Sequence, residues 1–387
     1  MSTATPTLPR TPRPGARDDV EAMIGDTPLV RLRRMFPADG PAVYLKLEQF
    51  NPGGSVKDRT ALGIIRHAEE TGVLRPGMTI VESSSGNTAI GLSLLAQSRG
   101  YHVVAICDRH LPAVKRARLR AFGADVVFLP DTPPGMDTVQ LRIRLAEHLA
   151  NVLPDAVTLG QYSSPGNARI HYETTGAEIW RDTGGHVSAL VAAVGTCGTI
   201  TGAGRYLKER DPSVSVVGVE PVGSVVFGGD HGTYLVQGGG LSFVPSIFDG
   251  GVVDTGIKVD DATTFGCVRD TALREGWLLG GTGGLVVAGI QRIAERYGPD
   301  DTVVGIVADS GDRYVETLFD EDWMAGHAAG AAPVSAWAAH PATAALTQAL
   351  GCSVNAVPAD PGPALAEFCH TIGFDPAGLP VPPEGAA

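Results

Sequence analysis

Residues 189–202 read ALVAAVGTCGTITG, which is a run of apolar residues followed by a glycine-rich turn and a segment that we expect to be helical. A run that is apolar throughout is typical of a parallel strand covered on both faces. Backbone N–H groups at the start of a helix favour an anion such as a phosphate. The turn lacks the Lys of a Walker loop and the G-x-G-x-x-G spacing, so nucleotide binding is the weaker interpretation. A glycine-rich turn that binds no ligand is equally compatible with the pattern.

Strand-like and helix-like stretches alternate along most of the chain. We expect strands at 43–47, 79–81, 102–106, 125–129, 189–194, 214–219 and 303–307. We expect helices at 55–71, 87–99, 111–122, 167–181, 199–209, 262–275 and 284–297. This alternation predicts an α/β protein with doubly wound parallel sheets, in which ligands bind where strand ends meet loops and helix starts.

Composition limits the classes of function. The chain has 387 residues, which fits two domains, although one large domain is possible. A formal net charge of -12 disfavours nucleic acid and anionic membranes as main partners, while a local pocket can still take small anionic substrates. No apolar run approaches a spanning helix of ~18 residues, and the first twenty residues lack a signal-peptide core.

The cysteines are odd in number and widely spaced, without a C-x-x-C pair or a Cys/His group at metal-ligand spacing: Cys107, Cys197, Cys267, Cys352 and Cys369. This usage predicts reduced thiols in a soluble, cytoplasmic protein and no metal site.

A single lysine follows a Pro-Gly-Gly turn in NPGGSVKDRT (51–60), with Ser55 as a candidate N-cap. The partial positive charge at a helix start would lower the pKa of Lys57 and favour the neutral amine that forms an imine. The alternative is a solvent-facing lysine paired with Asp58 or Glu48.

A second strand-to-helix turn, ESSSGNTAIG (82–91), gathers five hydroxyl or amide side chains within residues 83–88. Such a turn presents hydroxyl and backbone N–H groups to an anion, typically a carboxylate. An ordinary capped helix start accounts for one of these side chains but hardly for all five.

Taken together and in order, these segments resemble the cysteine synthase and cystathionine β-synthase family, the fold-type II pyridoxal-phosphate enzymes with a tryptophan synthase β-like fold. The likeness covers about residues 24–323. Its pieces are IGDTPLVRL (24–32), NPGGSVKDR (51–59), SSGNTAIGL (84–92), GNARIHYETTGAEIW (166–180), GTCGTITG (195–202), VEP (219–221), EGWLLGGTGG (275–284) and DSGDRY (309–314).

The resemblance implies pyridoxal 5'-phosphate as cofactor, held by Lys57 as a Schiff base; Lys57 would then move the Cα proton. Asn87 would bind the ring hydroxyl oxygen. Thr282 would face the pyridine nitrogen, where a hydroxyl suits β-elimination better than transamination. The cofactor phosphate would lie against the turn formed by Gly195, Thr196, Cys197, Gly198 and Thr199, although Cys197 stands where the family usually has a small residue.

Substrate residues follow from the same likeness. The substrate carboxylate would be held by Ser84, Ser85, Thr88 and Gln161. Tyr162 replaces the usual Phe; its hydroxyl would donate to a substrate or be satisfied within the protein. Lys115, Arg116, Arg118 and Arg120 would either assist a phosphate leaving group or form an exposed basic face.

The implied reaction is a β-replacement that converts O-acetylserine or O-phosphoserine through an α-aminoacrylate to L-cysteine or another β-substituted alanine. Residues 161–180 look like cysteine synthases. By contrast, VESSSGNTAIGL and DSGDRYVETLFDEDW look closer to N-(2-amino-2-carboxyethyl)-L-glutamate synthases of 2,3-diaminopropionate biosynthesis, and the latter stretch also resembles cystathionine β-synthases. A serine or threonine dehydratase and a partner-binding relative without catalysis are further alternatives.

The resemblance also implies a homodimer and a division into domains. Residues 21–41 and 156–323 would form a large cofactor-binding domain, and residues 42–155 a smaller domain that moves. We expect residues 1–20 to be a flexible arm. Residues 324–387 would be an extension of unknown role, with a helix near 341–350.

Overall fold

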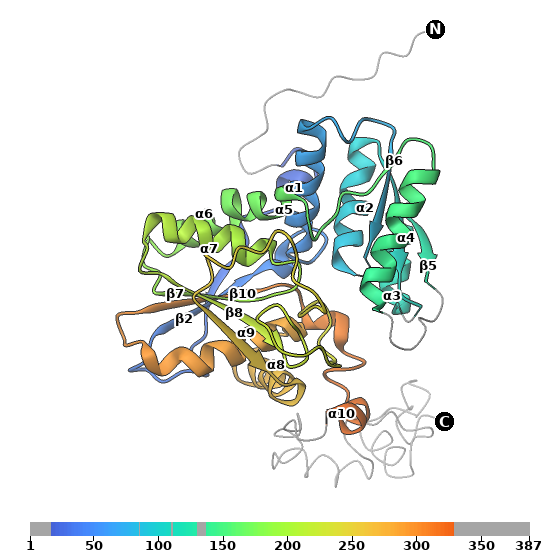
Figure 1. Ribbon diagram of the computed structural model, residues 1–387. Coiled ribbons are helices and arrows are strands. Elements are labelled where there is room, and N and C mark those ends of the chain that lie inside the picture. The colour runs from blue at the N-terminus through green and yellow to red at the C-terminus, as the bar shows by residue number, and fades with distance from the viewer. Residues whose placement is uncertain (1–16, 85, 110, 130–136, 329–387) are drawn as a thin grey trace, which may run out of the picture. The chain divides into compact units, whose positions relative to one another are not determined.

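The computed structural model describes residues 17–84, 86–109, 111–129 and 137–328. It contains two sheets (Figure 1). The larger has the order β1 (Leu29–Arg31), β2 (Ala42–Leu47), β10 (Thr302–Val307), β7 (Ala189–Ala193), β8 (Ser215–Pro221) and β9 (Thr255–Val259). The smaller has the order β5 (Asp125–Phe128), β4 (His102–Cys107), β3 (Thr79–Ser83) and β6 (Ala156–Val157). The β1–β2 pair is antiparallel, and the other strand pairs are parallel.

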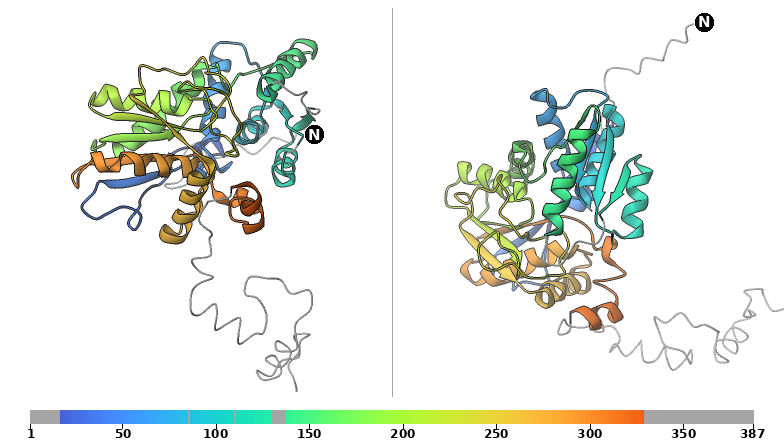
Figure 2. Two further views of the ribbon diagram at one scale, coloured as in Figure 1. Left: turned by 60° about the horizontal axis from the view of Figure 1, so that its bottom comes forward. Right: turned by 45° about the vertical axis from the view of Figure 1, so that its right-hand side comes forward.

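Helices cover both faces of each sheet. They are α1 (Lys57–Glu70), α2 (Asn87–Arg99), α3 (Ala113–Ala121), α4 (Thr138–Val152), α5 (Pro165–Ile170), α6 (Ala177–Asp182), α7 (Gly198–Arg210), α8 (Asp261–Glu275), α9 (Gly281–Ile293) and α10 (Glu321–His327). Figures 1 and 2 show α6 and α7 on one face of the larger sheet and α8 and α9 on the other. The smaller sheet lies between α2 and α4.

The alternation of side chains along β7 shows why this arrangement forms. Ala189 and Val191 pack into the core shared with α8 and α9, whereas Leu190 and Ala192 pack into the core shared with α7. Because successive side chains of a strand point to opposite faces, a strand buried on both faces must be apolar throughout. The doubly wound fold expected from residues 189–194 is therefore confirmed.

The elements differ from the expected ones in several places. Strands β1, β6 and β9 and helices α4 and α10 were not anticipated. The single helix expected at 167–181 consists of α5, a π-helical turn at His171–Gly176, and α6. Helix α7 crosses this segment closely: a Cβ added to Gly202 would lie 2.0 Å from the carbonyl oxygen of Ala168.

Sheet membership departs from the expected domain boundaries at two strands. Strand β2 begins at residue 42 but pairs along its length with β10 in the larger sheet. Strand β6, at the expected start of the large domain, pairs with β3 in the smaller sheet. The division into a cofactor domain and a moving domain stays a prediction. Residues 1–16 of the expected arm (1–20) and residues 329–387 of the expected tail (324–387), including the expected helix at 341–350, lie outside the described residues.

Within the described ranges, no helix is both long enough and apolar enough to cross a membrane.

Candidate active site

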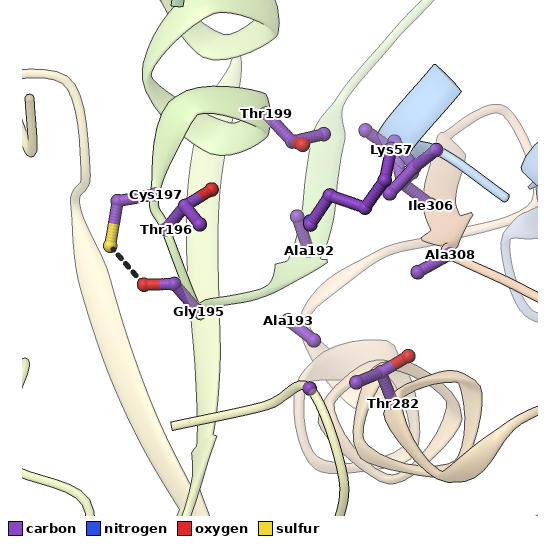
Figure 3. A pocket seen from close by; sticks show the side chains of 12 residues that line it. Lys57, Ala192, Ala193, Gly195, Thr196, Cys197, Thr199, Thr282, Ile306 and Ala308 are labelled. Carbon is purple, nitrogen blue, oxygen red and sulfur yellow. Dashed lines mark hydrogen bonds between the residues drawn. The ribbon is translucent and has the colours of Figure 1, made fainter. Parts of the chain in front are cut away.

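A cavity of about 610 Å³ lies where the carboxyl ends of strands from both sheets meet helix starts. Lys57, Asn87, Gln161, Thr196 and Thr282 all line it. The volume falls within the range of roughly 300–1,000 Å³ that is typical of ligand pockets. A smaller adjoining recess of about 30 Å³ is drawn in Figure 3, where Lys57 and Thr282 lie close to the turn that precedes α7.

Lys57 is the first residue of α1, and its backbone N–H donates to Ser55 Oγ at 3.2 Å. The N-cap position itself is Val56 rather than Ser55. Burial lowers the pKa of the Lys57 amine, although the charge of Asp309 acts in the opposite direction. In the described part of the chain, no hydrogen bond or ion pair is formed by Lys57 Nζ. The amine is thus a half-buried group with a lowered pKa that faces the recess (Figure 3).

Lys57 does not pair with Asp58 or Glu48, which was the alternative interpretation. Asp58 accepts the backbone N–H of Gly53 at 2.5 Å. Glu48 instead accepts from Arg59 Nε at 2.7 Å, and Arg59 Nη1 also donates to Glu178 Oε1 at 2.6 Å. This buried ion network fixes the start of α1 against α6, so the position of the lysine is set by its neighbours in sequence.

The glycine-rich turn runs into the start of α7 through Cys197, which has a left-handed φ of 69°. Glycine adopts this conformation without steric cost, which explains why a Cys is unusual there. Burial raises the pKa of Cys197 to about 12, so the side chain is a thiol. Its Sγ donates to the carbonyl oxygen of Gly195 at 3.4 Å (Figure 3).

Asn167 supports this turn from α5. Its Nδ2 donates to Thr196 Oγ1 at 3.1 Å and to the carbonyl oxygen of Gln161 at 2.8 Å. A Cβ added to Gly198 would lie 2.2 Å from Asn167 Oδ1, so only glycine fits there. Thr199 lies within hydrogen-bonding distance of His171 Nε2, at 3.2 Å. The first N–H groups of α7 have no partner inside the helix and can bind an anion.

Asn87 begins α2, and its amide is held from two sides. Asn87 Nδ2 donates to Asp309 Oδ2 at 2.8 Å, and Asn87 Oδ1 accepts from Arg313 Nη1. Tyr314 also donates to Asp309 Oδ2, at 2.8 Å. Sequence reasoning gave these three partners no role, although DSGDRY was a recognised segment.

The loop at residues 83–88, which we expect to bind the substrate carboxylate, is held by hydrogen bonds to Gln161 and within the loop. Thr88 Oγ1 donates to Gln161 Oε1 at 2.6 Å, and Gln161 Nε2 donates to the carbonyl oxygen of Ser83 at 2.8 Å. Ser84 Oγ accepts two backbone N–H groups at 3.3 Å, which leaves its hydroxyl proton available. Ser85 lies outside the described residues.

Two other expected residues also face the cavity. Thr282 is buried near the start of α9. Tyr162 packs edge-on against Phe243, with 5.4 Å between ring centroids, and burial raises its pKa to about 12. Tyr162 is therefore a neutral phenol, and its hydroxyl has no hydrogen-bond partner in the described ranges.

Helix α3 does not present all of its basic side chains to solvent. Arg116 and Arg120 are exposed, as a basic face predicts. Arg118 is half-buried and donates to the carbonyl oxygen of Gly53 at 2.9 Å. Lys115, by contrast, is buried and lines the cavity.

These features fit pyridoxal phosphate: a half-buried amine without a partner among the described residues, a helix start suited to a phosphate, and a fixed amide at Asn87. A family model described as "Pyridoxal-phosphate dependent enzyme" matches residues 20–309. The chain belongs to this family, and it is a pyridoxal-phosphate-dependent enzyme of the β-replacement class.

Particular relatives agree with this class. The chain is 39% identical over 305 residues to cysteine synthase B of Escherichia coli strain K12, covering 78% of this chain and 96% of the relative. It is 36% identical over 313 residues to cystathionine β-synthase of Apis mellifera, covering 79% of this chain but only 62% of that longer relative. A crystal structure of O-ureido-L-serine synthase matches with a TM-score of 0.73 and 35% identity, covering 84% of this chain and all (100%) of that one.

The comparisons confirm the predicted family, fold class and cofactor. The roles of individual site residues, the homodimer and the cytoplasmic location stay predictions.

Proposed function

We propose that this enzyme replaces the β-substituent of an O-activated L-serine, either O-acetylserine or O-phosphoserine, with a nucleophile to give L-cysteine or another β-substituted alanine. The observation that carries the proposal is that a single cavity is lined by Lys57, by the loop containing Ser84 and Thr88, and by Thr282. These are the groups needed to move a proton at Cα and to hold a substrate carboxylate.

Lys57 is proposed to bind the cofactor and then to act as the base. Bound pyridoxal phosphate supplies an electron sink next to the substrate Cα. Burial lowers the pKa of Lys57, which favours the neutral amine that would accept the Cα proton and return it to the product.

The other residues are proposed to position the reactants. Ser84, with its hydroxyl proton, and Gln161, with its second amide N–H, would bind the substrate carboxylate. Asn87 would present an amide whose orientation is fixed by Asp309. The start of α7 would bind the phosphate, and Thr282 would place a neutral hydroxyl at the ring nitrogen.

The identity of the nucleophile is the finer part of the proposal. Sulfide would give cysteine, homocysteine would give cystathionine, and an amino donor such as glutamate would give the 2,3-diaminopropionate precursor. Support for a nucleophile larger than sulfide comes from the size of the cavity, about 610 Å³, and from its wall, which includes the polar side chains Lys115, Arg142 and Tyr162.

The test is to give the purified holoenzyme O-acetylserine or O-phosphoserine in separate assays, each with sulfide, homocysteine or glutamate, and to identify the amino-acid products by mass spectrometry. We expect a β-substituted alanine from at least one pair. The Lys57→Ala variant should form none, while the control Lys208→Ala, near the far end of α7, should retain activity. Release of keto acid and ammonia without any nucleophile would instead identify a dehydratase.

A further inference from the structure

Lys115 is a buried cation in the wall of the substrate cavity. Its side chain comes from α3 and is only 6% exposed. Nζ donates to Gln237 Oε1 at 3.0 Å and lies 5.1 Å from the centre of the Tyr314 ring. In the described ranges, no carboxylate oxygen lies within 4.0 Å of Lys115 Nζ.

These contacts leave the ammonium group incompletely satisfied. An ammonium has three N–H donors, and among the described residues only one of them meets a protein acceptor. Burying a charge without an opposite charge is costly, and a ring contact returns only about 0.5–2 kcal/mol. Burial accordingly lowers the pKa of Lys115; Asp309 opposes this effect and Arg313 adds to it.

Asp309, whose charge acts on the pKa of Lys115, already has other partners. Asp309 Oδ2 accepts from Asn87 and from Tyr314. Arg142, a second cation in this wall, differs from Lys115, because its Nη1 is paired with Asp108 Oδ2 at 3.1 Å. Apart from Lys57, which would hold the cofactor, Lys115 is therefore the Lys or Arg lining this cavity whose contacts among the described residues include no carboxylate.

We propose that Lys115 and Gln237 form an oxyanion subsite in the substrate cavity, which takes a phosphate or carboxylate group carried by one of the two substrates. Gln237 accepts from Lys115 through Oε1, so its Nε2 N–H groups can donate to the same anion. This inference rests on the proposed function, and it adds that one of the two substrates carries an anionic group. The anion is either the leaving group of the activated serine or an acidic side chain of the nucleophile.

The experiment compares holoenzymes carrying Lys115→Gln and Lys115→Arg with the wild type. The control is Arg116→Gln, which removes an exposed charge from the same helix. Donors are O-phosphoserine and O-acetylserine, each with 2-mercaptoethanol. Nucleophiles are 3-mercaptopropionate and 2-mercaptoethanol, each with the donor that the wild type prefers.

If the subsite binds the leaving group, Lys115→Gln lowers kcat/KM at least tenfold with O-phosphoserine and less than twofold with O-acetylserine. If it binds the nucleophile, the same loss occurs with 3-mercaptopropionate but not with 2-mercaptoethanol. Lys115→Arg should retain most of the activity in both cases. Equal losses in all three distinct donor–nucleophile pairs, or no loss in any, would overturn the proposal.

Binding without turnover separates this inference from the proposed function. Calorimetric titration of wild-type holoenzyme with inorganic phosphate and with glutarate should detect at least one of them, and Lys115→Gln should weaken that binding at least tenfold. Unchanged binding in the variant, or no binding of either anion to the wild type, rejects the subsite. If the wild type forms no product from any substrate pair but the binding result holds, only the proposed function fails.

Discussion

The substitution Gly198→Ala tests how tightly the start of α7 is built. The added Cβ would lie 2.2 Å from Asn167 Oδ1. Asn167 is fully buried and is held by hydrogen bonds to Thr60, Gln161 and Thr196, so it cannot move aside freely. Either the helix start or the amide must shift.

The expected size of the effect follows from these contacts. Overpacking a buried site costs about 1–3 kcal/mol, and displacing Asn167 from its partners costs about 1–3 kcal/mol more. Replacing Gly by Ala in a helix returns only about 0.5–1 kcal/mol. We therefore expect Gly198→Ala to lower the free energy of unfolding by about 2–4 kcal/mol and to weaken cofactor binding, since the turn that would receive the phosphate moves.

Urea denaturation and titration with pyridoxal phosphate measure the two effects. The matched control is Gly266→Ala in α8, where no described atom outside the helix's own nearby backbone lies within 4 Å of the added Cβ and a slight stabilisation is expected. If Gly198→Ala unfolds at the same urea concentration as the wild type and binds the cofactor equally well, the reasoning about this helix start is refuted.

Three further predictions concern buried charges. Arg59→Leu should destabilise the protein by about 3–5 kcal/mol in urea denaturation, because Glu48 and Glu178 lose their shared partner; a variant within 1 kcal/mol of the wild type contradicts this. Burial raises the pKa of Glu82 to about 7, so its folded-state pKa lies above its unfolded value, and stability should fall as pH rises from about 4.5 to 7. Glu82→Gln should flatten that part of the stability profile, and an unchanged slope would show that another group causes it. Asp309→Asn should weaken pyridoxal phosphate binding about tenfold, because Asn87 loses a charged acceptor; the exposed control Asp312→Asn should bind normally, and equal affinities in both variants would refute the role of Asp309.

The sequence predicted the elements whose signals are local. Strand β7 and the turn at 195–199 are adjacent in sequence, so their pattern shows both the buried strand and the helix start. Lys57 follows a turn whose geometry is determined by residues adjacent to it in the sequence. Helix α4 was missed, although its cap was visible: Asp137 accepts the N–H groups of Val139 and Gln140. That cap follows residues 130–136, which carry no periodic signal.

Contacts between distant segments could not be predicted in this way. Asn87 and Asp309 are 222 residues apart, and only the meeting of the two sheets brings them together. Lys115 looks like part of a basic helix face, because the sequence does not show that Gln237 and Tyr314 lie against it. The left-handed backbone at Cys197 is equally invisible, since a thiol side chain gives no sign of it.

The most direct test of the whole account is to reduce the holoenzyme with borohydride, digest it, and find by mass spectrometry which lysine carries the pyridoxyl phosphate group. We predict a single modified peptide, with the label on Lys57. A label on Lys115 or on any other lysine, or an unlabelled Lys57 in protein saturated with the cofactor, would contradict the proposed chemistry.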